Sequence, residues 1–507
     1  MTTANSFAFK PKNYMKKVLL LSALFAFNFS LLTTVKAGGL VTNSNQNVSF
    51  LRQMSQDAII DITGIYLNPA GTAFLKDGWH ISANWQFATQ SRDITTTFPL
   101  FAQNLDNSAT THEFEGDALA PVIPSLHVSY NKDKWSVNGS ISLGGGGGKC
   151  EFDNGIGSFE AAYAGALLTN VPGLLPTMLQ PGLIAAGVPA AAAPALAATA
   201  TYDGYTMNSY MKGRQYYFGL SAGATYKFID NLAGFVGLRA VYATCNYNGF
   251  VKPSIGYTVP AAGTFPGTTG RADLANYGID LNCDQTGFGI TPIIGIDYKI
   301  NKHWNVAARF EAETKLRLKN KTEANVPAIV AANPSATALM GQFQDGTKIA
   351  ANIPAILSAG AQYSPIEKVR IMAGWHYYFD KAAKQYNSKQ KLIDKNTQEF
   401  SAGVEWDCCK WLTVSGSWQN TRYDLSDEYM NDLSFNLSNN MMGLGVRIHA
   451  SKKVDVDAGY MHTFYKDKNV LTNVSAPSLT DPNRTIPKID FYERSNDVFG
   501  IGVNINL

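Results

Sequence analysis

Basic side chains in segments of alternating polarity are the groups of this sequence best suited to chemistry. From Trp304 to Phe310 the apolar residues occupy every second position, so Arg309 belongs to the opposite face of an extended strand. If such strands close into a barrel, that face lines the lumen. The basic lumen candidates are Arg239, Arg309, Lys315, Arg317, Arg370 and His376, and Glu311, Glu313 and Glu405 share their faces. An inward guanidinium group could hold a carboxylate ligand. The alternative is that these charges pair with each other or with a plug in a polar lumen.

Catalysis finds no support in the motifs. The seven histidines show no metal-ligand spacing, and neither a Gly-x-Ser-x-Gly turn nor a phosphate-binding loop occurs. The sequence therefore predicts a protein that is not an enzyme and has no cofactor and no metal. Five cysteines are an odd number for an oxidising compartment. Cys245 and Cys283 flank one loop, so a disulfide between them remains open, whereas Cys408 and Cys409 suggest no chemistry.

The elements that position these residues are short strands with strict alternation. Residues 79–87, 135–143 and 369–379 each alternate apolar and polar side chains, and tryptophan or tyrosine stands near the ends of the apolar faces. Such ends resemble the aromatic girdles of membrane barrels. We count fourteen strands, which begin near Trp79, Pro124, Trp135, Tyr216, Leu232, Phe288, Trp304, Ile353, Val369, Phe400, Trp411, Asn440, Val454 and Val498.

The connections between the strands alternate in length. Short turns, which should face the periplasm, are expected at 131–134, 229–231, 301–303, 364–368, 407–410 and 451–453. Much longer loops, which should face the exterior, join the resulting hairpins. An even strand number places both ends of the barrel on the periplasmic side.

Composition agrees with a membrane barrel. Charged residues are only 16% of the chain and aromatic residues 12%, whereas soluble domains average about 25% charged residues. After residue 37 no apolar run reaches 18 residues, so the chain must span a membrane by strands if it spans one. The formal net charge of +3 gives no reason to expect nucleic acid.

The N-terminus has the pattern of a secretory signal peptide. Lys16 and Lys17 precede an apolar run from Val18 to Leu32, and the small residue Ala37 offers a cleavage site. The run is shorter than the roughly 20 residues of a spanning helix, and Met15 is an alternative start. Residues 1–37 are therefore expected to be an extension and signal peptide, residues 38–77 a plug, and residues 78–507 the barrel of an outer-membrane protein.

The segment before the first strand carries a specific resemblance. Gln56-Asp57-Ala58 leads to Asn68-Pro69-Ala70 just before the first strand, and this stretch resembles the N-terminal hatch of the FadL/TodX family of outer-membrane transporters. Residues 292–298, 304–315 and 353–375 are similar to central hairpins of that family. In the hatch, Arg52, Asp57 and Asp61 are candidate partners for the lumen charges.

The resemblance implies a monomeric barrel of fourteen strands whose hatch plugs the lumen. Such a barrel would capture long-chain fatty acids or aromatic hydrocarbons outside and release them sideways through its wall. Burial of each methylene contributes about 0.8 kcal/mol, so apolar sites can gather these ligands without energy input. The expected partners are the ligand, outer-membrane lipid, lipopolysaccharide and, during biogenesis, the barrel assembly machinery.

Two segments fit this mechanism. The run Gly144, Gly145, Gly146, Gly147 and Gly148 ends the third strand and is a candidate lateral opening, with a flexible loop stem as the alternative. The apolar loop from Phe159 to Ala200 contains five prolines, which predict short helices around a capture groove, with an inert insert as the alternative. A general diffusion porin and a haem-binding or adhesin-type surface receptor are the competing functions.

Overall fold

The computed structural model describes residues 46–274, 277–325, 341–432, 435–476, 481 and 483–507. The expected signal peptide, its cleavage site near Ala37 and the first residues of the hatch lie outside the described residues. The described helices are α2 Val48–Arg52, α3 Gly157–Ala185 and α4 Ala193–Ala197, with 3-10 turns η2 Ile62–Ile65, η3 Pro69–Phe74, η4 Pro99–Gln103, η6 Gly341–Phe343, η7 Tyr386–Leu392 and η8 Asp427–Tyr429. None of these helices has the length and apolarity needed to cross a membrane.

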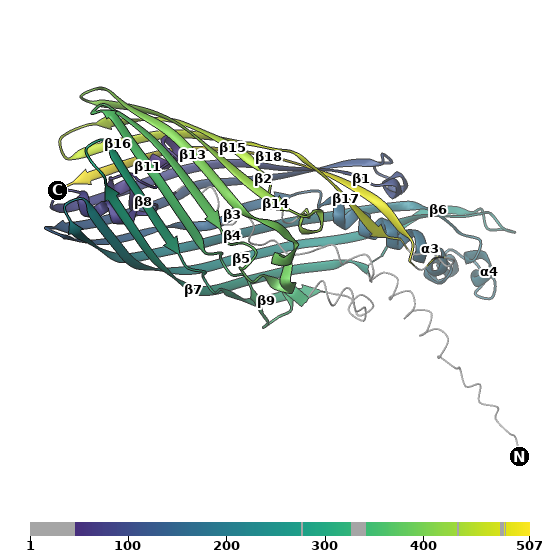
Figure 1. Cartoon of the computed structure of the whole chain (residues 1–507). Coiled ribbons are helices and arrows are strands. Elements are labelled where there is room, and N and C mark those ends of the chain that lie inside the picture. Colours follow the sequence, from purple (N-terminus) through teal and green to yellow (C-terminus); the bar gives the residue numbers. More distant parts are fainter. Residues whose placement is uncertain (1–45, 275–276, 326–340, 433–434, 477–480, 482) are drawn as a thin grey trace, which may run out of the picture.

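The strands of the described residues form one closed antiparallel barrel (Figure 1). They are β1 Gly78–Thr97, β2 Thr111–Lys132, β3 Trp135–Phe152, β4 Thr201–Ile229, β5 Leu232–Val259, β6 Thr268–Asp273, β7 Ile279–Lys299, β8 Trp304–Glu311, β9 Arg317–Asn325, β10 Lys348–Ala350, β11 Ile356–Ile366, β12 Val369–Tyr378, β13 Ile393–Cys409, β14 Leu412–Leu425, β15 Asn439–His449, β16 Val454–Tyr465, β17 Lys468–Ser475 and β18 Thr485–Asn506. Four short segments continue wall strands across an interruption: β6 with β7, β9 with β8, β10 with β11 and β17 with β16. The wall therefore has the predicted fourteen strands.

Pairing of the first strand with the last closes the barrel. β1 pairs with β18 from His80 opposite Asn506 to Thr97 opposite Ile489, without a register shift. The amide of Leu507 also donates to the carbonyl oxygen of Trp79 at 2.8 Å. All the predicted short turns lie at the end that holds the C-terminus, and α3, α4 and β6 lie at the opposite end (Figure 1).

The outer face carries an apolar band whose edge near the short turns is aromatic. Large apolar side chains such as Val236 and Leu444 are about two-thirds exposed, at 64% and 65%. Near the turns, neighbouring strands pair rings: Trp79 with Tyr130, Trp135 with Tyr226, and Trp304 with Tyr363, with centroids 4.5 to 4.8 Å apart. Such a band and girdle suit a wall that faces lipid.

Several strands are longer than the sequence indicated. β4 begins at Thr201 rather than near Tyr216, and it pairs with β5 from Thr201 opposite Thr258 onward. The added length lies toward the long loops. The outward positions there have no need to be apolar, so the alternation that marks the rest of the wall fades.

A charge in the apolar band should impair insertion. Phe499 is half exposed on β18, and its ring lies 4.7 Å from that of Tyr460. Phe499→Asp should cost about 2 kcal/mol or less, depending on depth, and should reduce the amount of heat-resistant barrel in membranes. Phe499→Leu is the control and should leave that amount unchanged. Equal yields of the two variants would contradict a lipid-facing position.

Candidate functional site

The hatch lies inside the barrel. Between Gln46 and Leu75 nearly every described residue is buried, including the polar ones. Asn68 begins η3 by accepting a hydrogen bond from the amide of Gly71 at 3.3 Å, and Pro69 occupies the first helical turn, where it displaces no helical hydrogen bond. Ala70 packs against Phe235 of β5 and Ile293 of β7. The Asn-Pro-Ala segment thus docks on the wall as well as forming a turn.

Inward-facing glycines let the hatch approach the wall closely. A Cβ at Gly443 of β15 would collide with the carbonyl oxygen of Leu51, and one at Gly459 of β16 would press on the Leu51 side chain. Because backbone atoms cannot move as a flexible side chain can, α2 depends on these two positions having no side chain. The wall sequence is therefore fitted to its plug.

Arg52 joins the hatch to three strands. Its guanidinium group forms ion pairs with Glu405 of β13 and with Asp457 of β16, the latter at 3.0 Å, and donates to Ser415 of β14 at 2.9 Å. Arg447 of β15 binds the same Asp457 at 2.8 Å and pairs with Asp61 of the hatch at 2.7 Å. A network of alternating charges therefore ties the hatch to this side of the lumen.

The other polar hatch residues also reach the wall. His376 lies between Asp57, at 2.8 Å, and Glu399, at 3.0 Å. Asn68 donates to Asp297 of β7. The predicted lumen residue His376 is thus placed inside as expected, but it contacts the hatch.

Arg239, Arg309 and Arg370 also face inward, and each has an acidic partner. Arg239 donates to both oxygens of Glu311 at 2.7 and 2.8 Å, and Arg309 lies 3.1 Å from the same carboxylate. Both guanidinium groups stack on the ring of Tyr66 from the hatch, at 4.4 and 5.2 Å. Arg370 pairs with Glu405 and Asp407. Of the alternatives open at the sequence level, the structure shows pairing with acids and with the hatch.

Lys315 and Arg317 do not line the lumen, so their predicted orientation is wrong. Both side chains are exposed, whereas Leu316 and Leu318 are fully buried. The reason is that β8 ends at Glu311, and the chain passes through an irregular stretch before β9 begins. Alternation resumes one residue out of phase.

The glycine run lies beside an interruption in the wall. β2 and β3 pair up to Leu126 opposite Ile141 and next at Asp117 opposite Glu151, with no ladder pairing between. Along this gap β2 stays paired with β1, with one register shift between Gln86 and Ala88, and β3 stays paired with β4, with two register shifts. Gly146 and Gly148 have φ of 112° and 68°, values that residues with a side chain rarely adopt.

Two prolines on the other side of the gap were missed by the sequence analysis. Pro121 and Pro124 lie in the unpaired part of β2. Proline has no amide hydrogen and is confined to strand edges or bulges, so the pair could have marked this edge. Inside the wall, Gly144 borders a cavity of about 10 Å³ together with Tyr66, Arg239 and Glu311. That volume is close to the minimum for one water molecule.

At the outer end, α3 is a single long helix, which corrects the expectation of short helices between prolines. It runs from Gly157 to Ala185 across Pro176 and Pro181. Each interior proline costs about 3 kcal/mol, but buried apolar residues recur at every fourth position, and each contributes about 1.5 to 3 kcal/mol. These are Tyr163, Leu167, Val171, Leu175, Leu179 and Leu183.

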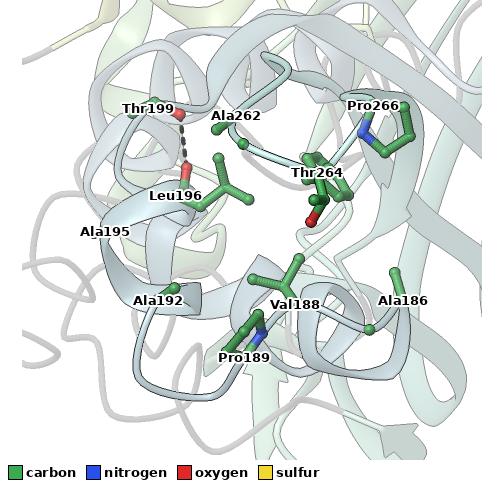
Figure 2. Close-up of a pocket in the computed structure, with 13 residues that line it drawn as sticks. Ala186, Val188, Pro189, Ala192, Ala195, Leu196, Thr199, Ala262, Thr264 and Pro266 are labelled. Carbon is green, nitrogen blue, oxygen red and sulfur yellow. Dashed lines mark hydrogen bonds between the residues drawn. The ribbon is translucent and has the colours of Figure 1, made fainter.

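A pocket of about 510 Å³ lies between the end of α3, α4 and the β5–β6 turn (Figure 2). Val188, Pro189 and Leu196 line one side, and Ala262 to Pro266 line the other. Its lining is largely apolar and includes the ring of Phe265. A volume of this size suits a small molecule.

Comparison of the whole structure with solved structures identifies the architecture. A Pseudomonas aeruginosa FadL homologue matches with a TM-score of 0.56 and 11% identity, over 92% of this chain and 100% of the other. The Pseudomonas putida toluene transporter TodX matches with a TM-score of 0.53 and 12% identity, over 94% and 99%. This chain has the FadL/TodX fold. The Ralstonia pickettii toluene transporter TbuX gives 0.50 and 12%, over 91% and 98%. No family model and no curated protein matches the sequence.

The five cysteines of this FadL/TodX-type barrel all lie within the described residues. Cys245 and Cys283 are both thiols, so the bridge between them that the sequence left open is absent. Within the described residues no cluster of His, Cys, Asp and Glu could hold a metal ion.

Removal of the positive charge of Arg52 should destabilise the folded barrel. Arg52→Met leaves Glu405 and Asp457 with one cation fewer in a buried network, and the loss of one partner of a buried ion pair costs roughly 3–5 kcal/mol. We expect a lower free energy of unfolding in urea and a higher ion conductance in planar bilayers. Arg214→Met, on an exposed outer position of β4, is the matched control. An unchanged unfolding midpoint would show that the network does not hold the hatch.

Proposed function

We propose that this protein passes hydrophobic small molecules, such as long-chain fatty acids or aromatic hydrocarbons, passively across the outer membrane of a Gram-negative bacterium. The ligand is captured at the outer pocket, binds within the wall and leaves sideways between β2 and β3. The observation that carries the proposal is the gap between these strands, which lies beside the glycine run. The fold likeness to TodX and TbuX, whose described cargo is toluene, supports it.

Capture is assigned to the pocket beside α4. It lies at the end of the barrel away from the short turns, where the loops are long (Figure 1). Its alanine, valine, leucine and proline side chains offer contact with an apolar ligand but few hydrogen bonds. Affinity would come from apolar surface removed from water, about 25 cal/mol for each Å².

We assign release of the ligand to the gap because of the position of the gap relative to the apolar band of the outer face. The gap begins beyond Leu126, and β1 beside it carries its last large outward apolar residue at Phe87. Beyond Phe87 the outward positions of β1 are Thr89, Ser91 and Asp93. The gap therefore starts within the outer part of the apolar band, where an apolar ligand would enter lipid without crossing water.

A diffusion porin is the second candidate, and the filled lumen disfavours it. The hatch is held by ion pairs to several strands, and the cavity beside Gly144 is too small for any solute larger than water. A porin requires an aqueous channel through the lumen of the barrel. No contact in the described residues favours a haem receptor or an adhesin.

Bulk at the inner side of the gap should slow transport. Gly144 faces the lumen cavity, and a Cβ there meets only the carbonyl oxygen of Tyr217 at 3.7 Å. Gly144→Leu should leave a heat-resistant barrel but reduce uptake of a labelled fatty acid or toluene by intact cells. The control is Gly139→Leu on the same strand, where the Cβ would lie 3.8 Å from the nearest atom, the carbonyl oxygen of Ser221. Equal uptake by the two variants would exclude this exit.

Filling the outer pocket should weaken capture. Ala192 and Ala191 are neighbouring exposed residues, but only Ala192 lines the pocket. Ala192→Trp should raise the ligand concentration needed for half-maximal uptake, whereas Ala191→Trp should not. The same half-maximal concentration for both variants would show that capture occurs elsewhere.

A further inference from the structure

Two arginines stand directly opposite each other inside the barrel. Arg92 of β1 and Arg494 of β18 are register partners in the closing pair. Their neighbours two residues away, Ile94 and Tyr492, are fully buried in the apolar core, and side chains two apart in a strand share a face. Both guanidinium groups therefore point into the lumen, from positions whose Cβ atoms are typically 4.5 to 5.5 Å apart in a sheet.

Neither arginine has an acidic partner. The other lumen arginines, Arg52, Arg239, Arg309, Arg370 and Arg447, each form at least one ion pair with a carboxylate. Within the described residues no carboxylate lies within ion-pair distance of Arg92 or Arg494, and the undescribed segments contain no Asp or Glu. Two like charges directly opposite each other destabilise a strand pair unless an anion joins them.

Aromatic rings hold the two side chains in place. The guanidinium carbon of Arg92 lies 5.8 Å from the ring centre of Phe435, and that of Arg494 lies 4.7 Å from the ring centre of Tyr465. Arg92 donates from its Nε to Gln90 at 2.9 Å, whereas the Nε of Arg494 is buried without a hydrogen-bond acceptor in the described part of the chain. Both residues remain partly accessible. Donors of this pair are thus available to an anion.

The pair lies where a ligand would pass. Across β1, Arg92 is opposite Gly116 of β2, next to Asp117, which marks the outer end of the gap. Cys150, two residues beyond the glycine run, is buried in the same apolar core as Ile94 and Tyr492. Core residues on this side of the lumen include the apolar side chains of Phe114 and Phe152. A positive pair bordered by aromatic and aliphatic groups suits a molecule with a charged head and an apolar body.

We propose that Arg92 and Arg494 form a head-group site that binds the carboxylate of an amphiphilic ligand beside the lateral gap. This inference rests on the proposed transport function and narrows it, because it selects anionic amphiphiles over neutral aromatic hydrocarbons. Two guanidinium groups around one carboxylate would supply charge-assisted hydrogen bonds. The apolar body of the ligand would then lie toward the gap.

The test compares ligands that differ only in the head group. The purified full-length protein in a non-ionic detergent is titrated with laurate, with 1-dodecanol and with acetate, and binding is followed by calorimetry. We expect laurate to bind about ten-fold more tightly than dodecanol or better, since hydrogen bonds between charged groups contribute about 1.5–3 kcal/mol. Acetate should bind far more weakly than laurate. Acetate binding as tight as laurate binding would indicate a site for small free anions and overturn the assignment.

Variants assign the preference to the pair. Arg92→Gln with Arg494→Gln should abolish the difference between laurate and dodecanol without weakening dodecanol binding, and Arg92→Lys with Arg494→Lys should restore part of it. Arg214→Gln, at an exposed site, is the control, and heat-resistant migration in gels verifies folding. A laurate preference that survives the double Gln variant would overturn the inference while leaving transport intact. Failure of the unaltered protein to bind either twelve-carbon ligand would contradict both proposals.

Discussion

The need to satisfy every backbone hydrogen bond within lipid is the constraint on which the rest of this structure depends. A sheet meets that need only when its edges pair, since an unpaired amide in hydrocarbon costs several kcal/mol. The unbroken register between β1 and β18 provides this closure. The longest interruption within the described wall, between β2 and β3, then becomes informative. Pro121 and Pro124 remove two donors from the unpaired edge, so the interruption is less costly than its length suggests.

Closure in turn determines what the lumen contains. A closed wall turns half of its side chains inward, and the charges among them need partners away from bulk water. Arg52, Asp57 and Asp61 of the hatch are partners for wall residues. Most basic lumen residues that seemed suited to a ligand therefore secure the plug. The pair Arg92 and Arg494 differs because neither the wall nor the hatch supplies a carboxylate for it.

Most of what the sequence could predict came from the alternation of apolar and polar residues along the strands. The strands around Trp79, Trp135 and Val369, the short turns and the closing strand follow from period-two patterns that lipid imposes on the outer face. Alternation did not predict the inward face of strands beyond the lipid-facing part of the wall. Lys315 and Arg317 were misplaced because an irregular stretch after Glu311 shifts the phase, and no residue type announces that shift. Extending the alternation past Phe87 and back from Val498 would have placed Arg92 and Arg494 inside.

The helix α3 shows a different limit of sequence analysis. Proline is a strong local signal against a helix, but the apolar residues at every fourth position report tertiary burial that only the folded loops provide. The prolines disfavour a helix locally, but the burial of the apolar side chains outweighs this preference. The Asn-Pro-Ala segment was the opposite case, because its capping chemistry is local and the sequence displays all of it.

The position of Arg52 in the chain has a consequence for the order of assembly. Arg52 precedes every described strand in the sequence, but its partners Glu405, Ser415 and Asp457 belong to strands near the end of the chain. An early part of the chain thus depends on contacts with strands near its end. Until β13 and β16 are in place, Arg52 has no carboxylate partner. The hatch therefore has its full set of ion pairs only when β13, β15 and β16 are present, and a chain truncated before β13 would lack both carboxylate partners of Arg52.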